Sequence, residues 1–316
     1  MYFVKSIETN QIRLWYSTHT VKTGYPCINR TLNCSSSRTF RLKSYSEPRL
    51  IETVRNNLDC LMQILRFNVT NHIYFFRITS DLVPFASHPV CSFAWDKYFS
   101  QQFIAIGNLI REHQIRISMH PGQYTLLNSV RPEVIDNSIR DLEYHTKILD
   151  AMMLDSTAKI QIHIGGVYGD KSASMERFVS YYESLDQSIK NRLAIENDDR
   201  SYTLQDCLSV NNTTGIPVIL DILHHELHNN GEHMIEALGR AAKTWRVEDG
   251  IPMVDYSQSD TVSGSHNLEL DIELFVRFVE ASKPLDFDIM LEIKDKESSA
   301  LKAIEIVRDD ERFFHK

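Results

Sequence analysis

The sequence lacks any long apolar run. Within its 316 residues no apolar stretch approaches the roughly 18 residues that a membrane-spanning helix requires. Residues 1–19 also lack the apolar core of a signal peptide. These absences argue against a membrane protein and a secreted one, so we expect a soluble, intracellular protein.

Cysteine is scarce and irregularly spaced. The chain has five cysteines, an odd number, and none of them forms a C-x-x-C pair. This pattern argues against a disulfide framework and against a structural zinc site, and a reducing cytosol fits it best. The cysteines are Cys27, Cys34, Cys60, Cys91 and Cys207.

The sequence also lacks an excess of basic residues. The chain has 34 lysines and arginines against 42 aspartates and glutamates, a formal net charge of −8. Taken alone, this argues against a polyanionic partner, because phosphate binding usually calls for a basic surface. The objection is weakened if the charge is uneven, or if bound divalent cations add positive charge that the residue count omits.

What the sequence does contain is an alternation of short apolar runs and longer amphipathic segments. Eight runs rich in Ile, Val, Leu and Phe predict strands buried on both faces, at 21–25, 73–78, 115–119, 159–164, 193–195, 217–220, 252–254 and 287–291. The segments that follow them predict helices over 47–67, 95–112, 132–154, 175–190, 204–210, 231–245, 268–282 and 296–308.

Eight strand–helix units predict a single α/β domain folded as a (β/α)₈ barrel over 20–316, with 1–19 as an unassigned extension. An open doubly wound sheet is the competing architecture. It usually carries a Gly-rich phosphate loop after the first strand, and the residues there, Gly24-Tyr25-Pro26-Cys27, do not form one.

Histidines and carboxylates follow six consecutive predicted strands. In such barrels the active site lies at the carboxyl ends of the strands, so these side chains should meet at one rim. Burying them unpaired would be very costly, and coordination of metal ions is the simplest way to avoid that cost. The candidate ligands are His120, His163, Glu196, Asp221, His224, Asp255, His266 and Glu292.

The ligand set contains nitrogen and oxygen but no sulfur, which suits Mn²⁺, Zn²⁺ or Fe²⁺. Eight ligands exceed what one ion uses, so we expect two or three divalent ions, with Glu196 as the bridge. Such a cluster activates a water and stabilises the attacking and leaving oxygens at phosphorus. Asp255 would add an oxygen ligand and favour a harder ion, so Mn²⁺ is our first choice, with Zn²⁺, Mg²⁺ or Co²⁺ as alternatives.

Short motifs follow the predicted strands from about residue 20 to 300, at 24–29, 76–81, 120–124, 163–166 with 169–171, 195–198, 221–225 and 291–296. Each motif is weak alone, but the ordered series resembles the UV damage endonuclease family, whose metal scaffold is shared by endonuclease IV.

The resemblance implies a DNA repair enzyme that nicks duplex DNA immediately 5′ to UV photoproducts, leaving a 3′-hydroxyl and a 5′-phosphate. It makes the ligands above, other than Asp255, the metal site. Gln123 and Tyr124 would form a wedge where the damaged dinucleotide is extruded, and Tyr25 and Asn29 would line the lesion pocket. Lys171, in a Gly-rich loop, would contact phosphate or assist catalysis.

One departure from the family pattern lies after the seventh strand, where relatives often place a lysine and then a histidine. Here the residues are Met253-Val254-Asp255, which puts in doubt any role that depends on that lysine or on its modification. The resemblance also implies damaged double-stranded DNA as the partner, with no membrane and no obligate protein partner. A monomer in a prokaryotic cytoplasm, acting at the nucleoid, is the expected state.

Three alternatives remain open. A metal-dependent sugar isomerase or epimerase would use a similar barrel, but Gln123-Tyr124 and the basic loop 38–43 favour a large polyanion. An abasic-site endonuclease would differ only in the lesions it cuts. A non-catalytic lesion-binding module would leave the ligand cluster unexplained.

Overall fold

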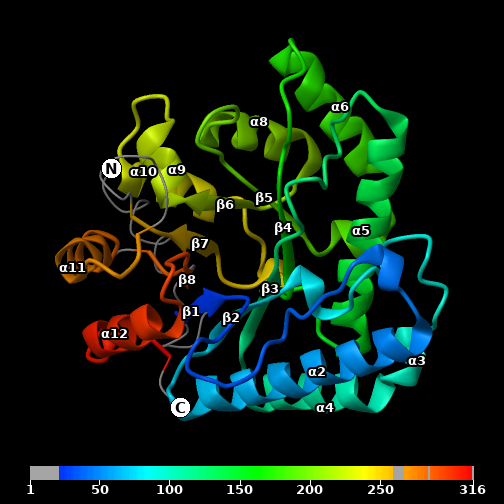
Figure 1. The fold of residues 1–316 in the computed structure, drawn as a ribbon. Helices are drawn as coiled ribbons and strands as arrows, with labels where there is room; N and C mark the ends of the chain where they lie inside the picture. The colour runs from blue at the N-terminus through cyan, green and yellow to red at the C-terminus, as the bar shows by residue number, and fades with distance from the viewer. Residues whose placement is uncertain (1–20, 259–266, 284, 315–316) are drawn as a thin grey trace, which may run out of the picture.

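Eight parallel strands close into a barrel in chain order, as the sequence predicted. The structure is a computed structural model and describes residues 21–258, 267–283 and 285–314. Helices surround the barrel (Figure 1). The strands are β1 Thr23–Pro26, β2 Phe75–Ile78, β3 Arg116–Met119, β4 Lys159–His163, β5 Leu193–Glu196, β6 Val218–Asp221, β7 Met253–Tyr256 and β8 Asp288–Leu291.

All eight predicted helical segments contain helix, but two of them are divided. The segment 95–112 breaks at Phe99, and the segment 175–190 breaks at Leu185 and Asp186. The α-helices are α2 Glu47–Thr70, α3 Trp95–Tyr98, α4 Ser100–Glu112, α5 Pro132–Ala151, α6 Lys171–Ser184, α7 Gln187–Lys190, α8 Leu204–Thr214, α9 Ile222–Leu227, α10 Met234–Ala242, α11 Ile272–Ala281 and α12 Glu297–Val307. Short 3₁₀ helices are η1 Leu42–Ser44, η2 Ser80–Leu82 and η3 Val247–Asp249.

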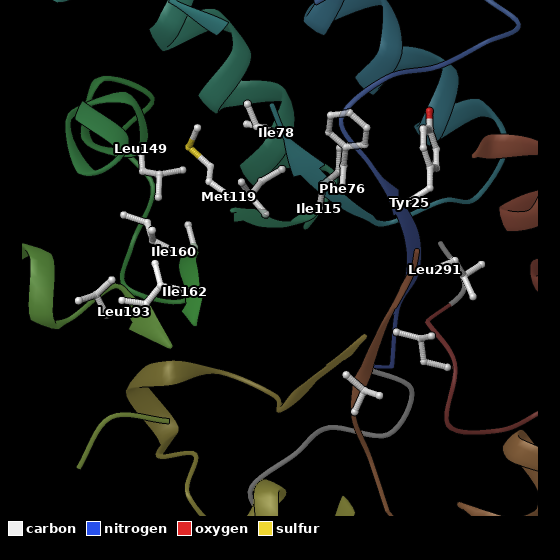
Figure 2. Close-up of a cluster of buried hydrophobic side chains, with 14 of the residues drawn as sticks. Tyr25, Phe76, Ile78, Ile115, Met119, Leu149, Ile160, Ile162, Leu193 and Leu291 are labelled. Atoms are coloured by element: carbon white, nitrogen blue, oxygen red, sulfur yellow. The ribbon is translucent and has the colours of Figure 1, made fainter. Parts of the chain in front are cut away.

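The outward faces of the strands pack under the helices. Because successive strand residues point to opposite faces, one set of side chains meets the helices and the other fills the barrel. Figure 2 shows part of the outer cluster, including Phe76, Ile160 and Leu291 from strands and Leu149 from α5. This continuous apolar layer holds the barrel and the surrounding helices together.

The barrel interior is layered. Arg77 on β2 bonds to Asp255 on β7, which is not its neighbour in the sheet, so this face of β2 points inward. Below that level lies a separate apolar cluster of Phe75, Ala194, Ile219, Met253 and Met290. Ionisable side chains therefore occupy the carboxyl end of the barrel, and this apolar cluster fills the interior below them.

A disulfide departs from the expectation of reduced cysteines. Cys34, in the loop after β1, is bonded to Cys60 on α2, with their Cα atoms 5.7 Å apart. The two are separated by 26 positions, so their proximity arises from the packing of the loop on the helix and not from any local spacing. Cys27, Cys91 and Cys207 are free thiols.

None of the helices in the described part of the chain combines the length and apolarity needed to cross a membrane.

Candidate metal centre

Three predicted ligands meet at the carboxyl ends of β3, β4 and β5. His120 Nε2 lies 2.9 Å from Glu196 Oε1, and His163 Nε2 lies 2.7 Å from the same oxygen. One potential ligand atom from each of the three lies within 4.8 Å of the others. Two imidazole nitrogens and a carboxylate oxygen aimed at one point form a donor set suited to a divalent transition metal.

Second hydrogen bonds orient two of the imidazoles at this rim. His120 Nδ1 lies 2.9 Å from the carbonyl oxygen of Pro121, and His224 Nδ1 lies 3.1 Å from that of Asn197. A carbonyl only accepts, so each Nδ1 carries the proton and donates it. Nε2 is then the nitrogen that each ring can offer to a metal ion, once the ion takes the place of any proton on it. The residues therefore fit a metal ion.

The electrostatics of the metal-free protein are consistent with this arrangement. Burial alone would raise the pKa of Glu196, but His163 and His120 hold it well below its usual value. Burial alone would lower the pKa of His163, but the negative charge and hydrogen bond of Glu196 raise it to about 9. A proton on His163 thus occupies the place that a cation would take.

A second group of candidate ligands lies at the ends of β6, β7 and β8. Asp221, Asp255 and Glu292 each present a carboxylate oxygen within 4.8 Å of the others. Burial raises the pKa of Asp221 to about 7, because the attraction of nearby His224 does not offset it. At Asp255 burial also acts to raise the pKa, but Arg77, which is bonded to both of its oxygens, opposes this and favours the ionised carboxylate.

His224 belongs to the edge of this second group. Asp221 caps α9 by accepting a 2.8 Å hydrogen bond from the His224 backbone N–H, and its Oδ2 lies 3.6 Å from His224 Nδ1. The Asn197 side chain bridges β5 and β6, accepting from the Asp221 N–H at 2.9 Å and donating to its carbonyl at 3.1 Å. Asn197 thus holds two ligand-bearing strands in register.

Two residues in the centre of the site, Arg77 and Gln161, were not among those predicted from the sequence. Arg77 donates to both oxygens of Asp255 and to Glu292, and Gln161 donates to Glu196 and Asp255. The sequence did contain an indication of both residues, because each is polar and stands between two apolar residues inside a predicted strand. Such a residue has to find a partner inside the barrel.

Lys171 is at the first position of α6 and faces a different set of partners. Its Nζ lies 2.5 Å from Asp206 and 5.5 Å from the centre of the Tyr202 ring. These contacts tie α6 to the start of α8. A catalytic role for Lys171 stays a prediction.

The four residues predicted to contact DNA fall into two pairs. Gln123 and Tyr124 lie in the loop after β3, and the Tyr124 side chain is 79% exposed. Tyr25 and Asn29 are buried instead: the Tyr25 hydroxyl donates to Asn68 at 2.7 Å and accepts from Asn29 at 2.8 Å. His266, the last predicted ligand, lies outside the described residues.

The fold and this site define the chain as a (β/α)₈ barrel with a histidine–carboxylate centre at the carboxyl rim. A family model described as UV-endonuclease UvdE matches residues 20–312. The chain belongs to this family.

Individual relatives agree. The UV DNA damage endonuclease of Clostridium perfringens (strain 13 / Type A) is 40% identical over 293 residues, covering 92% of this chain and 71% of that protein. The protein of the same name from Bacillus cereus (strain Q1) is 34% identical over 283 residues, covering 86% of this chain and 89% of that protein.

Among solved structures, the crystal structure of SacUVDE superposes with a TM-score of 0.89 at 42% identity, covering 93% of this chain and 100% of that one. Endonuclease IV from Thermus thermophilus superposes with a TM-score of 0.59 at 12% identity, covering 91% and 97%. A D-psicose 3-epimerase from Clostridium cellulolyticum gives 0.52 at 12%, covering 78% and 92%. The last two likenesses show a shared fold and nothing more.

Proposed function

We propose that this chain is a metal-dependent DNA repair endonuclease that nicks duplex DNA immediately 5′ to UV photoproducts. The substrates would be cyclobutane pyrimidine dimers, 6-4 photoproducts and abasic sites, and the products a 3′-hydroxyl and a 5′-phosphate. The observation that carries the proposal is the gathering of histidines and carboxylates in two groups at the carboxyl rim of the barrel. Family membership supplies the class of substrate.

Divalent cations, when bound, would acidify a water and neutralise charge on the attacking and leaving oxygens at phosphorus. This chain's part is to hold them. His120, His163 and Glu196 would form one subsite, and Asp221, His224 and Glu292 would contribute to a second, together with His266. Glu196, central among the ligands, would bridge the two. We propose two or three ions, with Mn²⁺ preferred by the nitrogen–oxygen donor set.

The loop after β3 would provide lesion selectivity. Extruding a nucleotide leaves an unstacked gap in the duplex, and a planar aromatic beside an amide can fill it. Tyr124 is exposed and lies four positions after His120, so a duplex lying on the rim would meet both. Because photoproducts stack and pair poorly, they cost less to extrude than normal bases, and this difference selects damage without reading sequence.

The proposal further takes the chain to be a monomer in a prokaryotic cytoplasm, with 20–316 as the catalytic domain. Tyr25 and Asn29 would act indirectly, by fixing the shape of the loop after β1. Asn29 accepts hydrogen bonds from the backbone N–H groups of Thr31 and Leu32 at 3.0 and 2.9 Å.

The test is incision of an end-labelled duplex that carries one cyclobutane thymine dimer, with Mn²⁺ and with EDTA. We expect a nick immediately 5′ to the dimer with Mn²⁺, none with EDTA, and none in the undamaged duplex. Cleavage of both duplexes at equal rates would refute lesion selectivity. No cleavage with any divalent metal would refute the reaction and make sugar phosphates the next substrates to test.

A further inference from the structure

Arg77 is a fixed positive charge inside the proposed metal centre. Its side chain is 3% exposed. One guanidinium nitrogen donates to Asp255 Oδ1 at 2.7 Å and Oδ2 at 2.9 Å, and to Gln161 Oε1 at 2.9 Å. The other terminal nitrogen donates to Glu292 Oε1. A guanidinium does not give up its proton in proteins, so this charge has to keep a carboxylate partner with or without metal.

Asp255 is the carboxylate best placed to be that permanent partner. It is fully buried. Oδ1 accepts from Arg77, and Oδ2 accepts from both Arg77 and the Gln161 amide. A metal ion at Asp255 would compete with these donors for the carboxylate oxygens and would place its charge beside a buried arginine, which can move neither to solvent nor to its neutral form.

The two carboxylates beside Asp255 differ from it. The Glu292 side chain is 20% exposed, and its contact with Arg77 is made through Oε1. Asp221 accepts a backbone N–H at Oδ1 and has His224, another candidate ligand, 3.6 Å from Oδ2. Asp221 can ligate a metal ion through Oδ2 while Oδ1 keeps its backbone contact, whereas Arg77 engages both oxygens of Asp255.

We propose that Asp255, although it groups with Asp221 and Glu292, is not a metal ligand but the fixed counterion of Arg77. Together with Gln161 the pair forms a positioning unit on the floor of the centre. Arg77 fixes one oxygen of Glu292, and Gln161 fixes Oε2 of Glu196 opposite the oxygen that faces the two histidines. The inference rests on the proposed metal-dependent function and narrows which residues perform it.

The experiment compares metal content among matched variants. Arg77→Gln/Asp255→Asn removes both charges and keeps side chains that can hydrogen-bond to each other. Asp255→Asn alone leaves the buried guanidinium without its fully buried counterion. Asp221→Asn is the control for loss of a true ligand. Each protein is saturated with Mn²⁺, freed of excess metal by gel filtration, and analysed for ions per chain by mass spectrometry.

We expect the double variant to hold the parent's number of ions and Asp221→Asn to hold one fewer. In metal-free protein, Asp255→Asn should lower the melting temperature by about 5–10 °C, and adding Arg77→Gln should recover most of that loss. As a positioning unit, the pair should matter for turnover: the double variant should lose about 10- to 100-fold in kcat with KM within about twofold.

Loss of one ion per chain in the double variant, as in Asp221→Asn, would overturn the inference and make Asp255 a ligand. Unchanged kcat with full metal content would overturn the positioning role. A parent protein that binds no divalent metal would instead refute the proposed function, so the two failures are distinguishable.

Discussion

Replacing Tyr124 by alanine should separate lesion recognition from stability. The side chain is 79% exposed, so its loss should change the free energy of unfolding by less than about 0.5 kcal/mol. If the ring fills the gap left by an extruded dinucleotide, its loss removes stacking of about 1–3 kcal/mol on the bases that border the gap. Binding to damaged duplex should then weaken about 5- to 150-fold, while binding to undamaged duplex changes little.

The measurement is fluorescence anisotropy with labelled duplexes, damaged and undamaged, in EDTA so that nothing is cut. Val247→Ala is the matched control, because Val247 is 71% exposed and lies in η3 before β7, at the opposite end of the barrel. Equal weakening on both duplexes would mean that Tyr124 contacts DNA without sensing damage. No weakening on either would refute the wedge.

The site makes three more predictions. Glu196→Gln should lower the number of Mn²⁺ ions per chain and abolish incision with the circular dichroism spectrum unchanged; normal incision would rule out the bridging role. Tyr25→Phe leaves Asn68 Oδ1 and the Asn29 amide without their hydrogen-bond partner, so urea unfolding should show that the free energy of unfolding falls by about 1–3 kcal/mol with incision specificity retained. Altered specificity at full stability would instead place Tyr25 in contact with the lesion. Because Glu196 raises the pKa of His163 to about 9, Mn²⁺ bound there would have to displace a proton at neutral pH. Calorimetry should show the affinity for Mn²⁺ rising roughly tenfold per pH unit up to about 9, and a flat profile would exclude this competition.

The barrel was predictable because each strand is marked by its own apolar run. The ends of helices were less so, since no proline or glycine marks the break at Phe99 between α3 and α4. Phe99 is fully buried, and its non-helical backbone stands between the two parts of the predicted helix 95–112. Likewise, the predicted lesion residue Tyr25 is indistinguishable in sequence from a core tyrosine, and its burial is explained only by its packing against Phe76 and by the bond from its hydroxyl to Asn68 on α2.

Strand-end positions located the candidate ligands but did not show which of them would bind metal and which would pair with Arg77. This difference in role depends on contacts between strands that are not neighbours. Arg77 on β2 meets Asp255 on β7, and Gln161 on β4 meets the same carboxylate. Strand order and alternation place all three inside the barrel, yet which polar groups pair there follows from side-chain reach across the interior.

The site therefore contains two kinds of positive charge. The proton on His163 beside Glu196 is exchangeable, because a metal ion can replace it and bind the same atoms. The charge of Arg77 is permanent: burial alone would lower its pKa, but Asp255 and Glu292 raise it further above an already high value. Without metal, both charges offset part of the negative charge of the buried carboxylates. A bound metal ion would displace only the first, so metal ions should gather on the side of His120, His163 and Asp221, with Arg77 at the edge of the site.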